Sequence, residues 1–110
     1  PLVERFKPGM IFVSAGFDSH WDDPLTTLGL SSAGYFALTK QLVELAAMHC
    51  DGKIVFVLEG GYNPEAIASG VDACLFALAK SNFTPADDPS PYAEPDIQPR
   101  LDVLRKWHGF

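Results

Sequence analysis

Two short apolar runs constrain what this chain can fold into more than any other feature of the sequence. MIFVSAG covers residues 10–16 and KIVFVLEGG covers residues 53–61, and a turn sequence containing glycine precedes each run. Continuous apolar runs of this length are typical of strands that are buried on both faces of a parallel sheet. We therefore predict two buried strands that pair in parallel.

A helical pattern follows each predicted strand. Before the first helix, Ser31 or Ser32 can act as the N-cap, and the pattern ends between His49 and Gly52. For the second helix, Asn63 is a good N-cap and Pro64 suits the first helical position. The apolar positions at helical spacing are Tyr35, Leu38, Leu42 and Leu45 in the first helix, and Ile67, Val71, Cys74, Leu75 and Leu78 in the second.

This order of elements predicts an α/β fold built on a βαβα unit. Two strands alone leave two open edges and little core, so we expect further strands to flank them. The opening sequence PLVERFKPGM lacks an initiator methionine and reads as the end of a helix. We therefore expect this chain to be a fragment, the C-terminal part of a larger parallel sheet.

The chain divides into two parts by composition. Residues 1–82 form the α/β part, and residues 83–110 form an acidic tail, because five of the nine prolines lie between residues 84 and 99. A short helix is predicted from about Pro99 to Trp107. Its apolar side would carry Ile97, Leu101, Leu104 and His108.

Charge and cysteine content exclude several functional classes. The formal net charge is −6 and the eight Lys and Arg residues are scattered, which argues against direct nucleic-acid binding and against an anionic membrane surface. No apolar run approaches the roughly 18 residues that a membrane span needs. Cys50 and Cys74 form no CxxC motif and predict buried free thiols in a reducing, intracellular compartment. Tyr35 and the phenylalanines are predicted to lie in the core.

Ligands of open parallel α/β sheets bind at the carboxyl ends of the strands. SAGFDSHWDDPL follows the first predicted strand and EGGYN follows the second, so these loops meet if the strands are neighbours. In the first loop, Asp22 and Asp23 form either an acidic turn before Pro24 or a source of one metal-binding carboxylate.

Two further side chains of the first loop, those of Asp18 and His20, have oxygen or nitrogen atoms that could bind a metal. Asp18 and His20 could join Asp23 as a self-contained ligand set, although a short flexible loop does not fix such a set. The alternative is that Asp18 stiffens the turn, His20 is exposed and Trp21 packs over the loop.

Paired glycines dominate the second loop. Gly60 and Gly61 form either a tight strand-to-helix turn with a half-buried Tyr62, or a place where a ligand approaches the backbone closely. In the second case, the Tyr62 hydroxyl could donate a hydrogen bond to a developing oxyanion. The glycine spacing excludes the common phosphate-binding loops.

Taken together, SAGFDSHWDDPL, GLSSAGY and VLEGGYN resemble the zinc-dependent histone deacetylase family, from about Phe6 to Leu78. The likeness is to the class II and bacterial branch, which includes acetylpolyamine amidohydrolases and acetoin-utilisation proteins. The resemblance implies an arginase-like α/β fold and a Zn²⁺ cofactor. It also implies an acetylated protein or polyamine as substrate.

The resemblance also implies roles for three residues. Asp23 matches a zinc-ligating aspartate, Tyr62 matches the tyrosine that polarises the acyl oxygen, and Leu30 matches a hydrophobic wall of the acyl-lysine tunnel. The Asp-x-His ligand pair and the His-His dyad of the family have no match in the 110 residues, because Asp18-Ser19-His20 sits in the wrong motif.

The missing ligands leave alternatives to a complete enzyme. We expect the isolated chain to be inactive and its parent to be active, with the N-terminal part of the domain as a partner. One alternative is a truncated, catalytically silent interaction module. Another is an arginase-type hydrolase with two manganese ions, against which the single DDP and the GGY tyrosine argue.

Overall fold

The structure is a computed structural model and describes residues 1–81 and 88–110. Its elements are the helix α1 (Leu2–Phe6), the strand β1 (Ile11–Ala15), the helix α2 (Ser32–His49), the strand β2 (Ile54–Leu58), the helix α3 (Pro64–Leu78) and the helix α4 (Gln98–His108). The predicted βαβα order is confirmed, and both strands lie within the predicted runs. None of the helices in the described residues combines the length and apolarity that crossing a bilayer requires.

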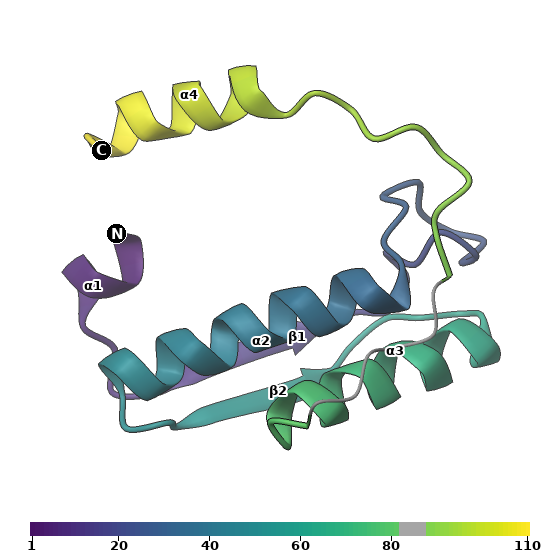
Figure 1. The fold of residues 1–110 in the computed structure, drawn as a ribbon, viewed down its shortest axis with the longest axis horizontal. Coiled ribbons are helices and arrows are strands. Elements are labelled where there is room, and N and C mark those ends of the chain that lie inside the picture. Colours follow the sequence, from purple (N-terminus) through teal and green to yellow (C-terminus); the bar gives the residue numbers. More distant parts are fainter. Residues whose placement is uncertain (82–87) are drawn as a thin grey trace.

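The two strands pair in parallel, as predicted, and Ile11 of β1 aligns with Ile54 of β2. The helices α2 and α3 contact each other extensively and run side by side along the sheet (Figure 1). The predicted caps also hold: the Ser31 side chain accepts the Gly34 N–H, and Pro64 occupies the first turn of α3.

The buried core lies where α2 and α3 meet the carboxyl end of the sheet. It consists of Phe17, Tyr35, Ala73 and Cys74, with Ile67 and Val71 among the partly buried residues packed against it. Both cysteines are free and buried, as predicted. Burial raises the pKa of the Tyr35 hydroxyl to about 12, so this phenol stays protonated.

Several residues predicted to be buried are exposed. Leu38 and Leu75 are 48% and 56% exposed, and each lines an open cavity that Phe56 of β2 also borders. The prediction that all phenylalanines lie in the core is wrong for Phe6, Phe12 and Phe110. Phe12 projects from the sheet face opposite the helices, which nothing in the described chain covers.

The tail extends away from the sheet before it forms α4 (Figure 1). Helix α4 is one residue longer at each end than predicted, and its apolar side chains Ile97 and Leu104 are largely exposed. Arg5 donates hydrogen bonds to the carbonyl groups of His108 and Gly109, which joins α4 to the N-terminal helix. Pro85 and the boundary between the two predicted parts lie outside the described residues, so that division stays a prediction.

Candidate functional site

The loop after β1 and the turn after β2 meet at the carboxyl end of the sheet. Backbone hydrogen bonds continue past the strands, from the Glu59 N–H to the Ala15 carbonyl and from the Phe17 N–H to the Gly60 carbonyl at 2.7 Å. The two segments that the sequence singled out are therefore neighbours. Their separation is set by the sheet itself rather than by flexible side chains.

The Asp23 carboxylate joins these two segments. Its Oδ2 accepts the Tyr62 N–H at 2.7 Å and the Asn63 N–H at 3.3 Å, while its Oδ1 accepts the Leu25 N–H at 2.9 Å. Asp23 is 6% exposed. Asp23 and the backbone of Tyr62 thus lie in direct contact, although 39 residues separate them in the sequence.

These contacts keep Asp23 ionised. Burial alone would raise the pKa of Asp23, but the backbone N–H groups of Leu25, Tyr62 and Asn63, together with nearby His20, lower it below the ordinary value of 3.8. The site therefore holds a fixed negative charge at neutral pH. Three hydrogen bonds use three of the roughly four lone-pair positions of a carboxylate, which leaves one on Oδ1.

Asn63 connects the same two segments a second time. Its side-chain oxygen caps α3 by accepting the N–H groups of Glu65 and Ala66, and its Nδ2 donates to the backbone and side-chain oxygens of Asp22. Asp22 therefore binds the cap residue of α3, whereas Asp23 binds the backbone just before that helix. The two aspartates of the DDP sequence therefore hydrogen-bond the loop after β1 to the turn after β2.

The paired glycines are required by close packing. Gly61 has a φ of 140°, and a Cβ there would lie 2.8 Å from Ile67 Cγ1. A Cβ at Gly60 would lie 3.1 Å from the Asp18 carboxylate. These glycines therefore form the tight turn of the first sequence interpretation, but the half-buried Tyr62 which that interpretation expected is exposed instead. The Tyr62 side chain is 59% exposed, so its phenol projects from a backbone that is fixed.

The prediction that His20 is exposed is wrong. His20 is only 4% exposed, and its Nε2 lies 3.0 Å from Oδ2 of Asp88. The imidazole is therefore engaged by the tail and does not form a ligand set with Asp18 and Asp23. Sequence reasoning missed this pair because 68 residues separate the partners and neither belongs to a periodic pattern. Trp21 also contacts the tail, by donating from Nε1 to the Asp88 carbonyl.

Leu30 is not a member of the hydrogen-bonded group around Asp23 among the described residues. Its backbone bonds to Ser19 and Trp21, and its side chain packs against the core. It also lines a cavity of about 500 Å³ between the start of α2 and the tail, where Tyr92 contributes to the opposite wall. The role that the resemblance implies for Leu30 stays a prediction.

The residues present do not complete a zinc site. A catalytic zinc needs three protein ligands, and no group of three His, Cys, Asp or Glu residues is placed to hold a metal within residues 1–81 and 88–110. Asp23 fits as one contributor, because it is ionised and keeps one Oδ1 lone pair. The remaining ligands are not found in the described part of this chain.

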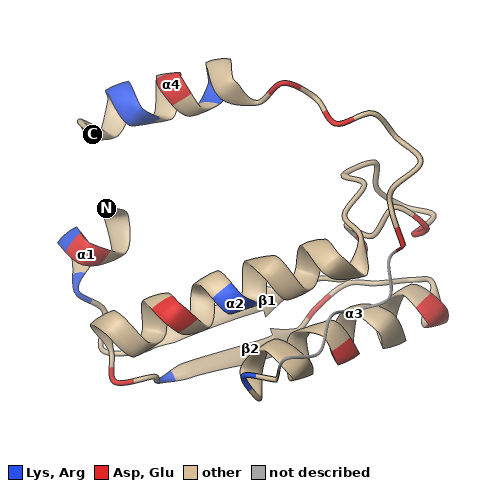
Figure 2. Ribbon diagram, in the orientation of Figure 1, with Lys and Arg blue, Asp and Glu red and all other residues tan. Residues whose placement is uncertain are grey.

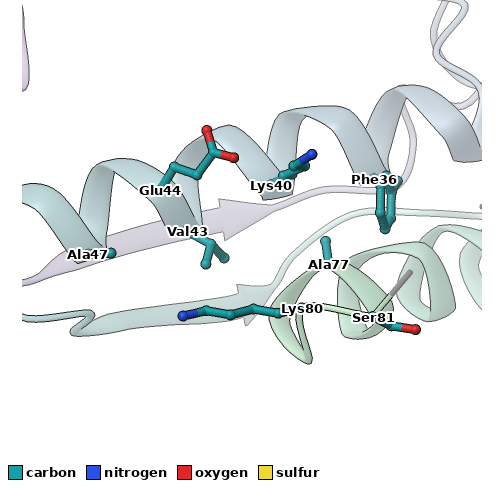
Figure 3. A pocket seen from close by; sticks show the side chains of 8 residues that line it. All are labelled: Phe36, Lys40, Val43, Glu44, Ala47, Ala77, Lys80 and Ser81. Atoms are coloured by element: carbon teal, nitrogen blue, oxygen red, sulfur yellow. The ribbon is translucent and has the colours of Figure 1, made fainter. Parts of the chain in front are cut away.

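Neither basic residues nor the cavity between the helices offers a competing site. The Lys and Arg residues are spread over separate elements, as Figure 2 shows. The cavity of about 310 Å³ between α2 and α3 is bordered by Phe36, Val43 and Ala77, while the charged ends of Lys40 and Lys80 point in different directions (Figure 3). These cations do not converge on a common ligand position.

Comparison with known proteins gives this geometry a family context. The histone deacetylase domain matches residues 1–78. Histone deacetylase 14, chloroplastic, from Arabidopsis thaliana is 42% identical over 108 residues, which cover 96% of this chain and 26% of that protein. A probable deacetylase from Archaeoglobus fulgidus is 49% identical over 65 residues, which cover 59% of this chain and 18% of that protein.

The same likeness extends to a solved structure. The crystal structure of the HDA15 HD domain matches with a TM-score of 0.73 and 34% sequence identity, over 100% of this chain and 28% of that chain. The parallel sheet and its two helices therefore have the α/β arrangement of histone deacetylase domains. The matched regions span 26%, 18% and 28% of the lengths of these three proteins.

Proposed function

The chain belongs to the histone deacetylase family, and from that membership we propose that it supplies Asp23 and Tyr62 to the catalytic site of a deacetylase. The reaction would be hydrolysis of an acetyl amide on lysine or on a related amine such as a polyamine. The observation that carries this proposal is the 2.7 Å hydrogen bond from the Tyr62 N–H to the Asp23 carboxylate. This bond holds an ionised carboxylate against the backbone of a residue with an exposed phenol. Both lie at the carboxyl end of the sheet, where α/β proteins bind ligands.

Tyr62 acts in this proposal as a hydrogen-bond donor. Its backbone is fixed by Asp23 and by the Gly60-Gly61 turn, while its phenolic hydroxyl is free to approach a substrate. A fixed donor stabilises the negative charge that develops on the acyl oxygen when the amide carbonyl is attacked. An exposed aromatic side chain on a rigid turn suits this task better than a buried one.

Asp23 would contribute one ligand to a zinc ion in a complete domain. Zinc, when bound, supplies a Lewis acid that polarises the amide carbonyl. Because the described residues do not complete the ligand set, no metal-dependent step is assigned to them. We expect the remaining ligands and the general base to come from an N-terminal part of the same domain.

The uncovered face of the sheet supports this expectation of a partner segment. Phe12, Val55 and Val57 project from that face and are 69%, 39% and 46% exposed. Parallel strands are normally covered on both faces, and within the described part of the chain each strand has one unpaired edge. An N-terminal part of the domain that adds strands and covers this face would remove the apolar exposure.

A catalytically silent interaction module is the second candidate. The incomplete ligand set favours it, and the acidic tail offers a surface for partners. Metal analysis and activity of the longer protein separate the two. An intracellular location is part of both proposals and rests on the two buried free thiols.

The test uses the complete deacetylase domain that contains this chain. Tyr62→Phe should lower the deacetylation rate by about 10² to 10³, as loss of a single oxyanion donor does, without moving the unfolding midpoint, because only an exposed hydroxyl is removed. Asp23→Ala should abolish activity and lower zinc content. Ser69→Ala removes a hydroxyl from an exposed position of α3, outside both site loops, and should leave the rate unchanged. Near-normal turnover of both the Tyr62 and the Asp23 variants would contradict the proposal.

A further inference from the structure

One tail residue, Asp88, holds both ends of the loop segment that contains Asp23. Its Oδ2 lies 3.0 Å from His20 Nε2 and accepts the Ser32 hydroxyl at 2.8 Å. The Ser32 N–H also points to both carboxylate oxygens, at 3.0 and 3.1 Å. The Asp88 carbonyl accepts from Trp21 Nε1 at 3.0 Å. Residues 20 and 32 are thereby tied to one point in the tail.

The hydrogen bonds fix the tautomer of His20. Its Nδ1 lies 3.1 Å from the Asp22 nitrogen, and a backbone N–H can only donate. Nδ1 must therefore be unprotonated, and the neutral ring carries its proton on Nε2, which donates to Asp88. The rigid imidazole ring thus bonds to the Asp88 carboxylate on one side and to the Asp22 N–H on the other, so the position of Asp88 affects the backbone of Asp22.

The path continues from His20 to the site. The His20 carbonyl accepts the Asp23 N–H at 3.0 Å, so the ring and the carbonyl of His20 hold the backbone N–H groups of Asp22 and Asp23. The Asp23 carboxylate then holds the N–H groups of Tyr62 and Asn63. A continuous chain of hydrogen bonds therefore runs from the tail to the backbone of Tyr62.

The buried donors of His20 and Ser32 depend on the Asp88 carboxylate as their acceptor. His20 and Ser32 are each 4% exposed, so their donors have little access to water if the acceptor is lost. Burial alone would raise the pKa of Asp88, but the hydrogen bonds from Ser32 and His20 lower it below the ordinary value. An ionised acceptor therefore faces the three donor groups of His20 and Ser32.

We propose that Asp88 is a positioning residue for the catalytic site, acting through the His20 imidazole to fix the carboxylate of Asp23 and, through it, the backbone of Tyr62. The inference rests on the proposed function only for the catalytic role of Asp23 and Tyr62. The positional link itself does not depend on that role. The tail from Asp88 onward is in this view part of the machinery that shapes the site.

The test compares Asp88→Asn with Asp72→Asn in the complete deacetylase domain. Both changes remove one carboxylate charge, but Asp72 lies on an exposed position of α3. An asparagine at 88 offers one acceptor oxygen and places an amide donor against the Ser32 N–H. Amide hydrogen exchange at Tyr62 and Asn63 should accelerate by about tenfold or more in Asp88→Asn, and kcat should fall by about 10- to 100-fold with KM within about twofold. Asp72→Asn should change neither measurement.

Two His20 variants break the same path at different points. His20→Gln can still donate to Asp88 but loses the Asp22 acceptor, whereas His20→Asn keeps an acceptor near Asp22 and loses the Asp88 contact. Both should accelerate exchange at Tyr62 and Asn63, and adding Asp88→Asn should have little further effect. If Asp88→Asn fails to fold, His20→Asn decides the question, because it leaves the contacts between Asp88 and Ser32 in place.

The outcomes separate the two proposals. Unchanged exchange at Tyr62 and Asn63 in the variants would overturn the positional link, even if the unfolding midpoint falls. Faster exchange with unchanged kcat, in a domain that Asp23→Ala inactivates, would overturn the role of Asp88 in positioning the catalytic site. Retained activity in Asp23→Ala would refute the proposed function, while faster exchange in Asp88→Asn would still support the link from the tail to Asp23.

Discussion

Replacing Gly70 with alanine tests the packing that holds the two site loops. Gly70 lies in α3 against the ring of Phe17, and a Cβ at this position would lie 2.5 Å from Cδ1 and 3.0 Å from Cε1 of that ring. Non-bonded carbon atoms prefer about 3.5–4.0 Å, so the ring or the helix must move by about 1 Å. Phe17 is 3% exposed and belongs to the core with Tyr35 and Cys74, so a shift of its ring disturbs that core.

The expected destabilisation follows from two opposing effects. Overpacking a buried contact costs about 1–3 kcal/mol, whereas the better helix propensity of alanine returns up to about 1 kcal/mol. We therefore expect Gly70→Ala to lower the free energy of unfolding by about 1–2 kcal/mol, measured by urea denaturation. Because the Cβ of Phe17 lies 3.2 Å from a Cβ built on Gly61, a shift of the whole Phe17 residue should disturb the turn before Tyr62 as well.

Two controls make this prediction specific. Gly34 of α2 is also helical, but the one close contact of its added Cβ would be with the flexible end of Leu30, at 3.0 Å, while Ser31 Oγ lies at an ordinary 3.7 Å. Gly34→Ala should therefore be neutral or slightly stabilising. Phe17→Leu shortens the opposing side chain, so the double variant with Gly70→Ala should be less destabilised than the sum of the single variants. A Gly70→Ala protein as stable as the parent, or strictly additive variants, would refute the packing argument.

Three further predictions concern the cap, the carboxylates and the thiols. Asn63→Ala should lower the free energy of unfolding by about 0.5–2 kcal/mol through loss of the α3 cap. Asn63→Ser, which keeps a capping oxygen and places no charge beside the Asp22 carboxylate, should lose less in the same denaturation experiment. The lowered pKa values of Asp23 and Asp88 mean that their stabilisation is present above their unfolded pKa and is lost as the pH falls through the folded one. The unfolding midpoint should therefore decrease when the pH is lowered below about 4, and this decrease should be less steep in Asp88→Asn. A midpoint that rises on acidification would contradict this direction of the pH dependence. Cys50 and Cys74 are buried, and burial raises the pKa of Cys74 despite a hydrogen bond from Thr39, so both thiols should react with a disulfide reagent only after unfolding; rapid reaction in the folded protein would contradict the structure.

The elements that the sequence predicted correctly are those with local signals. Asn63 and Pro64 start α3 because an N-cap and a fixed φ act within one turn of the chain. The strands were found because each is a continuous apolar run between turn residues. The parallel pairing followed from the helix between them, since such a connection leads back in the same direction.

Burial and long-range contacts were harder to predict, for a physical reason. Helical spacing identifies an apolar face, but whether Leu75 is covered depends on which elements pack against it. The same holds for Phe12, whose strand is apolar on both faces although the described residues cover only one. His20 has no periodic signal, and its environment depends on Asp88, which the proline-rich tail brings back to the first loop. Contacts of this kind between a loop and the tail are determined by tertiary structure, so no local sequence pattern predicts them.

The loop contacts of Asp23 bear on how its proposed role as a zinc ligand can be tested. A carboxylate with no role beyond ligating an ion could sit on any rigid loop, but the Asp23 carboxylate accepts the N–H groups of Tyr62 and Asn63. Any change at Asp23 therefore alters both a charge and the position of the phenol, and the activity of an Asp23 variant alone cannot assign the loss to either. Asp23→Asn keeps an oxygen that can accept the Tyr62 N–H but removes the charge. If exchange at the Tyr62 amide is preserved in that variant while activity is lost, the charge of Asp23 has a role beyond holding the loop.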